Sequence, residues 1–552
     1  MCLKSAFLLI SLTIVEAERY GNNHVPVRRD SHVVATNFQD PNVTLLAPAF
    51  LSPETVPASF ANGSSAPTSE SVMSVCSRTI ARDKLTLADY FLQSLSIRND
   101  WMTYQTVDYR SEEGRAFRFA YLSKSSPTSN SNVNTIGKLR VWLQGGVHGN
   151  EPAGDQSLLA LLGKMDTNQA WTASLLERMD IMILLRYNLD GVAYFSRNLA
   201  SKLDPNRDHI RLARQQTRDI KRTFTGFGPH IAVDMHEFSA STTYGGSYKH
   251  GADAMYSAAK NLNINANIRR MSEDLFAVNI GKDLEAAGLR WEPYVTGSSS
   301  PTAGSSILFK EASSDPKIGR TAMALTQSIT FLCETRGIGL ADQEFRRRTV
   351  TALTMAESII QTAADNAENV LSTVEAGIEE FVNSQEDIVV TDYANTMDRK
   401  FTMIEIGTGS LVQVPVKFAS TTPTTANLTR ARPEAYLIPK AWASLVSRLS
   451  DSGVEVQRLD YAFRGTVEAL EITSLAFEDT YYEGVVPVTV TTTTVNIEVQ
   501  LPVGSYLVNT RQRNAGLAFV ALEPENIDSY VSFNIIPVAE RDEYPVYRVV
   551  PS

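Results

Sequence analysis

The chain of 552 residues is long enough for two or more domains, and its hydrophobic content of 43% is ample for buried cores. The formal net charge of −10 disfavours nucleic acid as a partner, because an acidic surface repels phosphate. After the first 17 residues no apolar run is long enough to span a bilayer, so we expect no membrane span.

The N-terminus is typical of a secretory signal peptide over residues 1–17. Lys4 supplies the positive charge, residues 6–15 the apolar stretch, and Val15-Glu16-Ala17 a small-residue cleavage site. The sequence therefore predicts a secreted protein, with vacuolar or periplasmic retention left open. Three Asn-x-Ser/Thr sequons agree with this route and predict a glycoprotein. They begin at Asn42, Asn62 and Asn427.

Residues 18–80 are rich in Ser, Pro, Asn and Thr without sustained periodicity, which predicts a flexible segment or a pro-segment. Cysteine is scarce: with Cys2 in the predicted signal peptide, Cys76 and Cys333 remain. These two could pair in an oxidising compartment. Alternatively, Cys333 is a small buried residue of an apolar run. The sequence leaves both alternatives open.

Residues 81–365 alternate strand-like and helical segments, which is typical of an α/β domain. Two segments have apolar residues at helical spacing, namely Ser157–Lys164 and Thr349–Asp365. Four apolar segments are predicted to be buried strands. They are Leu139–Leu143, Asp180–Leu185, His230–Asp234 and Ser328–Cys333.

Residues 366–552 are predicted to form a helical linker and a smaller β-rich accessory domain. The linker is a helical stretch over Glu368–Val382, and the domain contains one helix-like segment, Ala441–Ser450. Its many β-branched segments favour a sandwich. The strand-like segments are Ala435–Ile438, Val486–Val499 and Gly516–Leu522.

The most informative motif lies at 141–154, where an apolar strand runs into a Gly-Gly turn. His148 and Glu151 follow three residues apart, and Pro152 opens a helix. Such a turn directs both side chains to the carboxyl end of a strand, where open α/β sheets bind ligands. Imidazole nitrogen and carboxylate oxygen suit Zn²⁺. The spacing alone is common among surface residues, so the metal interpretation depends on the flanking strand, glycines and proline.

Polar residues also follow the other three predicted strands. His236 would complete a His₂Glu set whose fourth position is open for water, the pattern of catalytic zinc. The arginines near 186–207 suit an anionic group, although ordinary surface ion pairs are the alternative. Glu334 ends a buried strand, which is costly unless the carboxylate has a partner such as Arg336 or serves as a general base.

These motifs together resemble those of the zinc carboxypeptidases of the M14 family, the metallocarboxypeptidases. The matching elements lie in the family's order between about 139 and 340. They are His148-x-x-Glu151, Asn188-x-Asp190-Gly191, Arg197, Asp204-x-Asn206-Arg207, Asp234-x-His236 and Glu334. The resemblance implies an α/β/α sandwich around a mixed, mostly eight-stranded sheet.

The resemblance also implies a role for each site residue. One Zn²⁺ per chain is bound by His148, Glu151 and His236, and Asp204 orients the first of these histidines. Glu334 is the general base and then the acid. The other implied residues contact the substrate: Arg197 at the oxyanion, Asn206 and Arg207 at the terminal carboxylate, Tyr294 as the nearest candidate for a mobile tyrosine, and Arg320. For Arg320 a plain surface arginine is the alternative.

The sequence thus predicts a secreted zinc metallocarboxypeptidase that hydrolyses C-terminal bonds of peptides or proteins with a zinc-bound water activated by Glu334. The alternatives are an inactive relative that binds peptides or cell-surface material, and a zinc amidase with a non-peptide substrate. A serine hydrolase is disfavoured, because the chain has no Gly-x-Ser-x-Gly elbow. No acidic pocket residue stands out, which disfavours cleavage at basic residues. The oligomeric state is not predicted.

Overall fold

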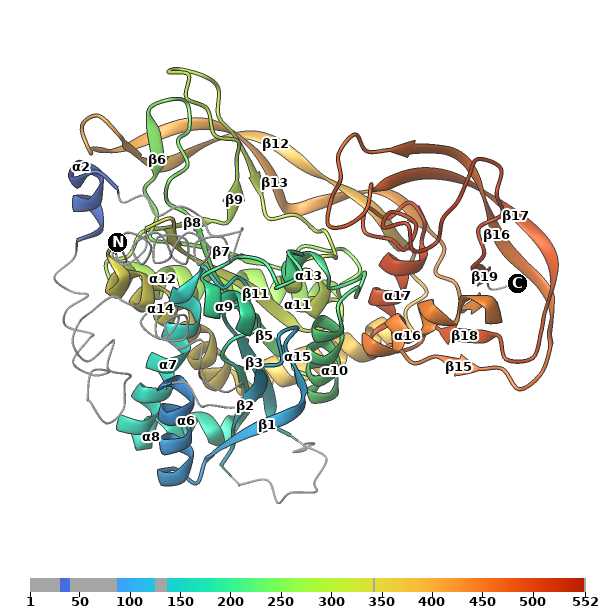
Figure 1. Cartoon of the computed structure of the whole chain (residues 1–552), viewed down its shortest axis with the longest axis horizontal. Coiled ribbons are helices and arrows are strands. Elements are labelled where there is room, and N and C mark those ends of the chain that lie inside the picture. The colour runs from blue at the N-terminus through green and yellow to red at the C-terminus, as the bar shows by residue number, and fades with distance from the viewer. Residues whose placement is uncertain (1–29, 40–86, 125–136, 341–342, 551–552) are drawn as a thin grey trace, which may run out of the picture.

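The computed structural model describes residues 30–39, 87–124, 137–340 and 343–550. Figure 1 shows two parts side by side, an α/β body that ends with helix α15 (Ala367–Asn383) and a smaller lobe at the C-terminal end. We call the second part the C-terminal lobe, residues 435–549. Among the described helices, none has both the length and the apolar character needed to cross a membrane. The predicted signal peptide, Asn42, Asn62 and Cys76 lie outside the described residues.

The body is built on a mixed eight-stranded sheet, as the family resemblance implies. The order of its strands is β1-β2-β4-β3-β5-β11-β7-β8. Their bounds are β1 (Met102–Arg110), β2 (Ala116–Leu122), β3 (Leu139–Gln144), β4 (Met179–Leu184), β5 (Ile231–Ser239), β7 (Ala254–Ala258), β8 (Trp291–Pro293) and β11 (Ile329–Ile338). The four predicted buried strands are therefore confirmed as β3, β4, β5 and β11.

These four strands form the parallel centre of the sheet. β3 pairs in parallel with β4 and β5, and β11 pairs in parallel with β5, whereas β1–β2, β2–β4 and β11–β7 are antiparallel. Because the carboxyl ends of parallel strands meet at one edge, the residues that follow these strands are brought together there. Central parallel strands are usually continuous apolar runs, but β5 carries Asp234, His236 and Glu237, all buried.

Helices cover both faces of the sheet, which confirms the α/β/α sandwich. One face packs against α6 (Leu87–Arg98), α7 (Pro152–Thr167), α8 (Gln169–Arg178), α11 (Ala266–Met271), α12 (Val278–Ala286) and α14 (Phe345–Asp365). The other face packs against α10 (Gln215–Phe227) and α9 (Leu189–Tyr194). In α10 the apolar Ile220, Phe224 and Phe227 recur at helical spacing, and Phe224 meets Trp142 of β3 edge-on at 5.3 Å.

A second sheet connects segments far apart in the chain. The long strands β12 (Ile388–Glu405) and β13 (Leu411–Arg430) form a ribbon that runs along the top of Figure 1. The sheet order is β6-β12-β13-β10-β9, where β6 (Tyr248–His250), β9 (Val295–Thr296) and β10 (Leu308–Glu311) come from the body. Strands on both sides of the predicted boundary at residue 366 therefore share one sheet.

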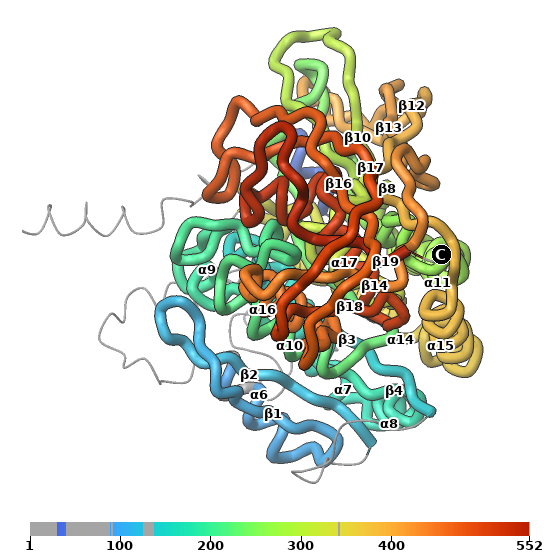
Figure 2. Tube along the Cα trace, turned by 90° about the vertical axis from the view of Figure 1, so that its right-hand side faces the viewer, coloured from blue at the N-terminus to red at the C-terminus, as the bar shows by residue number. Residues whose placement is uncertain are grey.

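The C-terminal lobe contains a six-stranded sheet and two helices. The strand order is β15-β18-β14-β19-β16-β17. The bounds are β14 (Ala435–Ile438), α16 (Ala443–Asp451), β15 (Gln457–Arg458), β16 (Phe463–Phe477), β17 (Val488–Leu501), β18 (Tyr506–Asn509), α17 (Ala515–Leu522) and β19 (Tyr547–Val549). Figure 2 turns this lobe toward the viewer and shows α16 beside α10 of the body.

Two expectations about this lobe are wrong. Residues 516–522 form the buried helix α17 and not a strand. An apolar run of this length has the same pattern in a buried helix and a buried strand, and its Ala and Leu residues favour the helix. The lobe is also not a sandwich of two sheets, because among the described residues α17 packs on the sheet and carries Phe519 to Tyr436 of β14 and Phe381 of α15.

Part of the predicted flexible segment is docked on the body. Residues 30–39 contain the short helix α2 (His32–Ala35) and a 3₁₀ turn over Thr36–Phe38. The buried Asp30 carboxylate pairs with Lys249 at 2.5 Å and with Arg336, and the Arg336 guanidinium lies 3.9 Å from the Phe38 ring centre. Cys333 is fully buried in β11, which agrees with the alternative of a small buried residue. Its pairing with Cys76 stays a prediction, because Cys76 lies outside the described residues.

Candidate active site

The three predicted metal ligands converge at the carboxyl edge of the parallel strands. His148 follows β3, Glu151 immediately precedes α7, and His236 lies in β5. All three are buried, and one donor atom from each lies within 4.8 Å of the others. His148 Nδ1 is 2.8 Å from Glu151 Oε1, His236 Nδ1 is 2.9 Å from Glu151 Oε2, and the two Nδ1 atoms are 3.1 Å apart. Two imidazole nitrogens and a carboxylate therefore point at a common centre.

Glycine makes this convergence sterically possible. A Cβ on Gly149 would lie 1.9 Å from the carbonyl carbon of Gly191, so the turn after β3 can approach the start of α9 only without a side chain. Asn188 caps α9 and accepts the Gly191 N–H at 2.8 Å. The Asn188-x-Asp190-Gly191 motif thus brings the start of α9 against the turn that contains His148. Pro152 at the first turn of α7 fixes where that helix begins.

Neighbouring carboxylates orient the two histidines. His148 Nε2 lies 3.0 Å from Asp204 Oδ1, and His236 Nε2 lies 3.1 Å from Asp234 Oδ1. A carboxylate on one ring nitrogen directs the other nitrogen toward a metal. Burial lowers the pKa of His236, but Asp234 and Glu151 outweigh burial and raise that pKa well above its usual value. Burial raises the pKa of Glu151, but the histidines outweigh it and hold that pKa well below the usual range.

Arg197 lies beside the ligands at the rim of the site. Its Nη1 donates to Glu151 Oε1 at 3.2 Å, and its Nη2 donates to Asp204 Oδ2 at 2.9 Å. The side chain is 32% exposed, whereas Glu151 and Asp204 are almost fully buried. The guanidinium can therefore face both the ligand set and an incoming molecule.

Glu334 lies across from His236 on the neighbouring strand, since the two residues are register partners in the β5–β11 pairing. The side chain is buried, and its Oε2 has no hydrogen-bond partner among the described residues. Burial raises its pKa to about 8, with Glu151 raising it further and His236 opposing the shift. Arg336 pairs with Asp30, so a simple Glu334–Arg336 salt bridge does not account for this carboxylate.

Asn206 and Arg207 lie on a 3₁₀ turn, Pro205–Arg207, next to the ligands. The Asn206 N–H donates to Asp204 Oδ1 at 2.8 Å, and the side-chain Oδ1 of Asn206 accepts the Gly319 N–H at 2.7 Å. The turn thus ties the residue that orients His148 to the segment that precedes β11. Arg207 Nη1 donates to the Asn206 carbonyl at 2.8 Å.

Tyr294 and Arg320 are electrostatically coupled to this group. Burial raises the pKa of Tyr294, and the nearby Glu334 raises it further. Arg320 is only 2% exposed, so the alternative of a surface arginine is wrong. Its Nη2 donates to the Ser313 carbonyl at 2.5 Å, while Nε and Nη1 have no partner among the described residues. Burial lowers the pKa of Arg320, opposed mainly by Tyr294.

One contact at the site comes from the C-terminal lobe and was not predicted from the sequence. Glu483 Oε2 accepts the Asp204 N–H at 2.9 Å, 279 residues away along the chain. The Glu483-Gly484 pair signals a turn, but no local pattern indicates which part of the molecule that turn meets.

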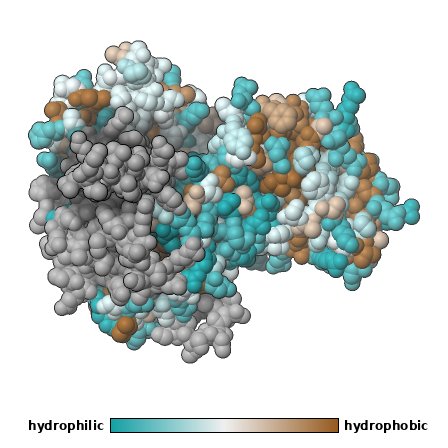
Figure 3. All heavy atoms as spheres, viewed as in Figure 1, coloured by the Kyte–Doolittle hydropathy of each residue, from teal (hydrophilic) through white to brown (hydrophobic). Residues whose placement is uncertain are grey.

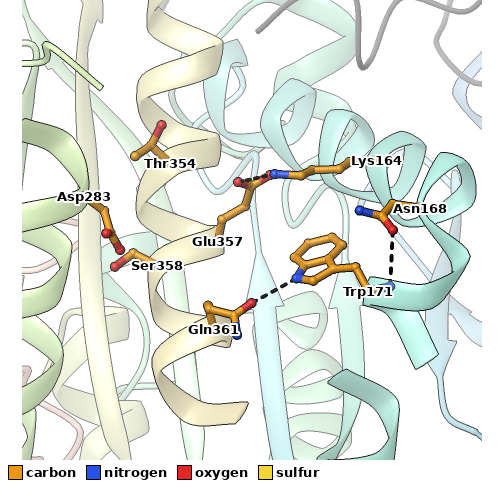
Figure 4. A pocket seen from close by; sticks show the side chains of 8 residues that line it. All are labelled: Lys164, Asn168, Trp171, Asp283, Thr354, Glu357, Ser358 and Gln361. Carbon is orange, nitrogen blue, oxygen red and sulfur yellow. Dashed lines mark hydrogen bonds and ion pairs between the residues drawn. The ribbon is translucent and has the colours of Figure 1, made fainter. Parts of the chain in front are cut away.

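A pocket of about 320 Å³ lies elsewhere, between helices α7, α8, α12 and α14 (Figure 4). The ion pair Lys164–Glu357 at 2.7 Å and the Trp171–Gln361 hydrogen bond at 2.9 Å join three of these helices around it. None of the candidate site residues lines this pocket. We therefore assign it no part in the site at the sheet edge.

Comparison with known families and proteins agrees with this geometry. The family model "Zinc carboxypeptidase" (peptidase M14) matches residues 91–273, a range that contains all three candidate ligands and ends before Glu334. "Carboxypeptidase 2" of Trichophyton equinum is 53% identical over 548 residues and covers 98% of both chains. "Carboxypeptidase 2" of Trichophyton rubrum is 53% identical over 549 residues, again with 98% of both chains covered.

Solved structures of carboxypeptidases are also similar to part of this chain. The metallo-carboxypeptidase from Burkholderia cenocepacia is 12% identical with a TM-score of 0.36, covering 50% of this chain and 69% of that one. Carboxypeptidase A from Helicoverpa armigera is 14% identical with a TM-score of 0.35, covering 55% of this chain and 81% of that one. The family assignment follows from the relatives that match over nearly the whole length. The chain belongs to the M14 family of zinc carboxypeptidases, which are peptide hydrolases.

Proposed function

We propose that this protein is a secreted, zinc-dependent carboxypeptidase that removes C-terminal residues from peptides, with Glu334 as the general base. One observation carries the proposal: two imidazole nitrogens and a carboxylate converge beside the buried carboxyl group of Glu334, whose Oε2 has no hydrogen-bond partner in the described part of the chain. A structural ion-pair network would leave neither the donor atoms pointing at one centre nor a buried carboxylate oxygen without a partner.

The residues present fit a zinc ion. His148 Nδ1, His236 Nδ1 and the Glu151 carboxylate provide three donors, and Asp204 and Asp234 hold the two rings in the required orientation. Arg197 lies beside this set, with its Nη1 3.2 Å from Glu151 Oε1. When bound there, Zn²⁺ supplies Lewis acidity, which favours both deprotonation of water and polarisation of a peptide carbonyl.

Glu334 is suited to carry a proton through the reaction. In the proposed reaction its carboxylate takes a proton from the attacking water as the water oxygen bonds to the scissile carbonyl carbon. It then gives that proton to the nitrogen of the departing residue as the carbon–nitrogen bond breaks. A raised pKa supports this double role, because a general acid–base group works best when its pKa lies near the working pH.

The arginines account for recognition of the peptide. Arg197, partly exposed beside Glu151, is placed to stabilise the negative charge that develops on the carbonyl oxygen. Asn206 and Arg207 are assigned to the terminal carboxylate, which a guanidinium can bind through two parallel hydrogen bonds. Arg320 offers two further buried nitrogens, and a carboxylate of the substrate is a suitable partner for them.

Purified protein incubated with a peptide should release free C-terminal amino acids, detected by mass spectrometry of the shortened peptide. A chelator should abolish the release, and added zinc should restore it. Release that persists after complete metal removal would contradict the proposal. Retained zinc with no cleavage of any peptide would favour a binding protein or an amidase with a non-peptide substrate.

Secretion is proposed from the N-terminal signal and from the exposed sequon at Asn427. N-terminal sequencing of protein recovered from culture medium should find a chain that begins after Ala17 or further along. A full-length N-terminus on intracellular protein alone would contradict secretion.

A further inference from the structure

The connection between β16 and β17 in the C-terminal lobe contains a tight hairpin turn. Tyr482 and Val485 exchange two backbone hydrogen bonds, at 2.7 and 3.0 Å. The two residues between them have positive φ, 49° at Glu483 and 93° at Gly484. Positive φ at both central positions is characteristic of a type I′ turn, which glycine adopts easily and glutamate does not. Such a conformation persists when contacts around it are favourable.

Those contacts are with the candidate active site. Glu483 Oε2 accepts the N–H of Asp204 at 2.9 Å, and the Glu483 carbonyl accepts a hydrogen bond from Arg211. Asp204 is the residue whose carboxylate orients His148 and Arg197. Asp204 is 5% exposed, so without Glu483 its N–H would be buried without this acceptor.

A second acidic residue of the lobe contacts the segment that precedes β11. Asp528, which is 1% exposed, accepts the backbone N–H of Lys317 at 2.8 Å and the Lys317 ammonium at 2.9 Å. Gly319, two residues further along, donates to Asn206. The lobe therefore holds both segments that support the 3₁₀ turn of Asn206 and Arg207.

The charges at this junction agree with the contacts. Burial raises the pKa of Tyr482, and Arg207 is the nearby group that most opposes the shift. Burial also raises the pKa of Glu483, opposed first by the hydrogen bond from Asp204. On the face drawn in Figure 3, the surface between the body and the lobe is hydrophilic, as expected where charged side chains meet.

We propose that the C-terminal lobe completes the active site, with Glu483 as a positioning residue for Asp204 and, through it, for His148 and Arg197. Glu483 does not touch the substrate in this proposal. Its carboxylate fixes the backbone of Asp204, and the lobe thereby acts on the zinc ligands and on the substrate-binding turn. The part of the inference that concerns catalysis rests on the proposed function, whereas the part that concerns Asp204 and zinc does not.

The test compares four full-length, zinc-loaded variants with the wild type. Glu483→Ala removes the acceptor, and Glu483→Asp retracts the carboxylate by one methylene while tolerating positive φ at least as well. Glu483→Gln keeps an oxygen that can accept the Asp204 N–H, so this variant should behave like the wild type. Glu478→Ala is the matched control, because Glu478 is an exposed glutamate of the same connection.

Hydrogen exchange at the Asp204 amide should become about fivefold faster or more in Glu483→Ala, with exchange within the lobe unchanged. Zinc affinity, or kcat/KM on a peptide, should fall by about 10- to 100-fold. In Glu483→Gln the exchange rate at Asp204, the zinc affinity and kcat/KM should each stay within about threefold of the wild-type value. If Glu483→Ala does not fold, Glu483→Asp decides by the same criteria.

The inference would be overturned if a folded Glu483→Ala or Glu483→Asp variant kept the wild-type hydrogen exchange at Asp204 and the wild-type zinc affinity. It would also be overturned if Glu478→Ala lost as much zinc affinity or kcat/KM as the Glu483 variants. A wild-type protein without peptidase activity contradicts the proposed function only, because exchange at Asp204 and zinc affinity are measured without turnover.

Discussion

Glu334 of β11 lies directly opposite His236 of β5 in a parallel pairing that runs from Ile329 opposite Ile231 to Arg336 opposite Phe238. Paired residues of neighbouring strands project to the same face of a sheet. The candidate base and a candidate ligand are therefore held together by the backbone of two buried strands and not by a loop. This arrangement gives the proposed proton carrier a fixed position beside the proposed metal.

Replacing Glu334 by Gln should lower kcat by about 10²- to 10⁴-fold, the usual contribution of a general acid–base group. The amide keeps the size of the side chain but cannot accept the proton from water. Zinc content, measured by elemental analysis, should remain that of the wild type, because Glu334 is not among the converging donors. A variant that keeps more than a tenth of the wild-type kcat would show that another group carries the proton.

Replacing Arg197 by Met should reduce kcat by about 100-fold or more with a smaller effect on KM, since loss of one oxyanion donor costs about 3 kcal/mol in the transition state. The methionine keeps part of the aliphatic stem. Steady-state kinetics with one peptide over a range of concentrations separates the two parameters. A change confined to KM would instead assign Arg197 to ground-state binding of the peptide.

Zinc should stabilise the folded protein. At a free zinc concentration about 100-fold above the dissociation constant, the expected gain is about 2.7 kcal/mol, which should appear as a higher thermal unfolding midpoint than after treatment with a chelator. In His148→Ala this zinc-dependent increase should be lost. An equal increase in the variant would mean that zinc stabilises the protein from a different site.

Lys221 should make stability depend on pH. It is buried in α10, its ammonium donates to the Ala322 carbonyl at 3.1 Å, and burial lowers its pKa to about 7. At pH values between about 7 and the ordinary lysine pKa, the unfolded chain holds a proton on Lys221 that the folded protein does not. Lys221 therefore destabilises the folded protein fully below about pH 7, and this destabilisation decreases as the pH rises.

The variant Lys221→Met should therefore unfold at a higher temperature than the wild type at pH 6, with a gain of at least about 1 kcal/mol. This advantage should shrink between about pH 7 and pH 10. Thermal unfolding of both proteins across this range measures the difference directly. A difference that does not vary with pH would show that Lys221 keeps an ordinary pKa in the folded protein.

Much of the site could be predicted because its residues come directly after apolar runs of the sequence, although the strands β5 and β11 extend past His236 and Glu334. β3, β5 and β11 are continuous buried runs, and parallel strands bring their carboxyl ends together, so His148, His236 and Glu334 could be grouped before any geometry was known. For residues 516–522 the periodicity could not distinguish helix from strand, because the run is buried on all sides, and only its Ala and Leu content favoured the helix that forms.

Long-range contacts likewise could not be predicted from the sequence. The contact of Glu483 with Asp204 and the docking of Asp30 on Arg336 join segments separated by hundreds of residues. Each depends on tertiary packing, and no local pattern indicates which distant segment Glu483 or Asp30 contacts. The ribbon of β12 and β13 is a further example. Residues of β13 alternate between exposed and buried from Gln413 to Phe418, but the pairing of the ribbon with β6 and β10 is set by the body.

The central claim is that one zinc ion is held jointly by His148, Glu151 and His236. The most direct measurement is a crystal structure of the zinc-loaded protein with anomalous data collected at the zinc absorption edge. We expect one strong peak per chain, about 2.0–2.2 Å from His148 Nδ1, His236 Nδ1 and a Glu151 carboxylate oxygen. A peak coordinated by other residues, or an active protein with no peak at these three side chains, would contradict it.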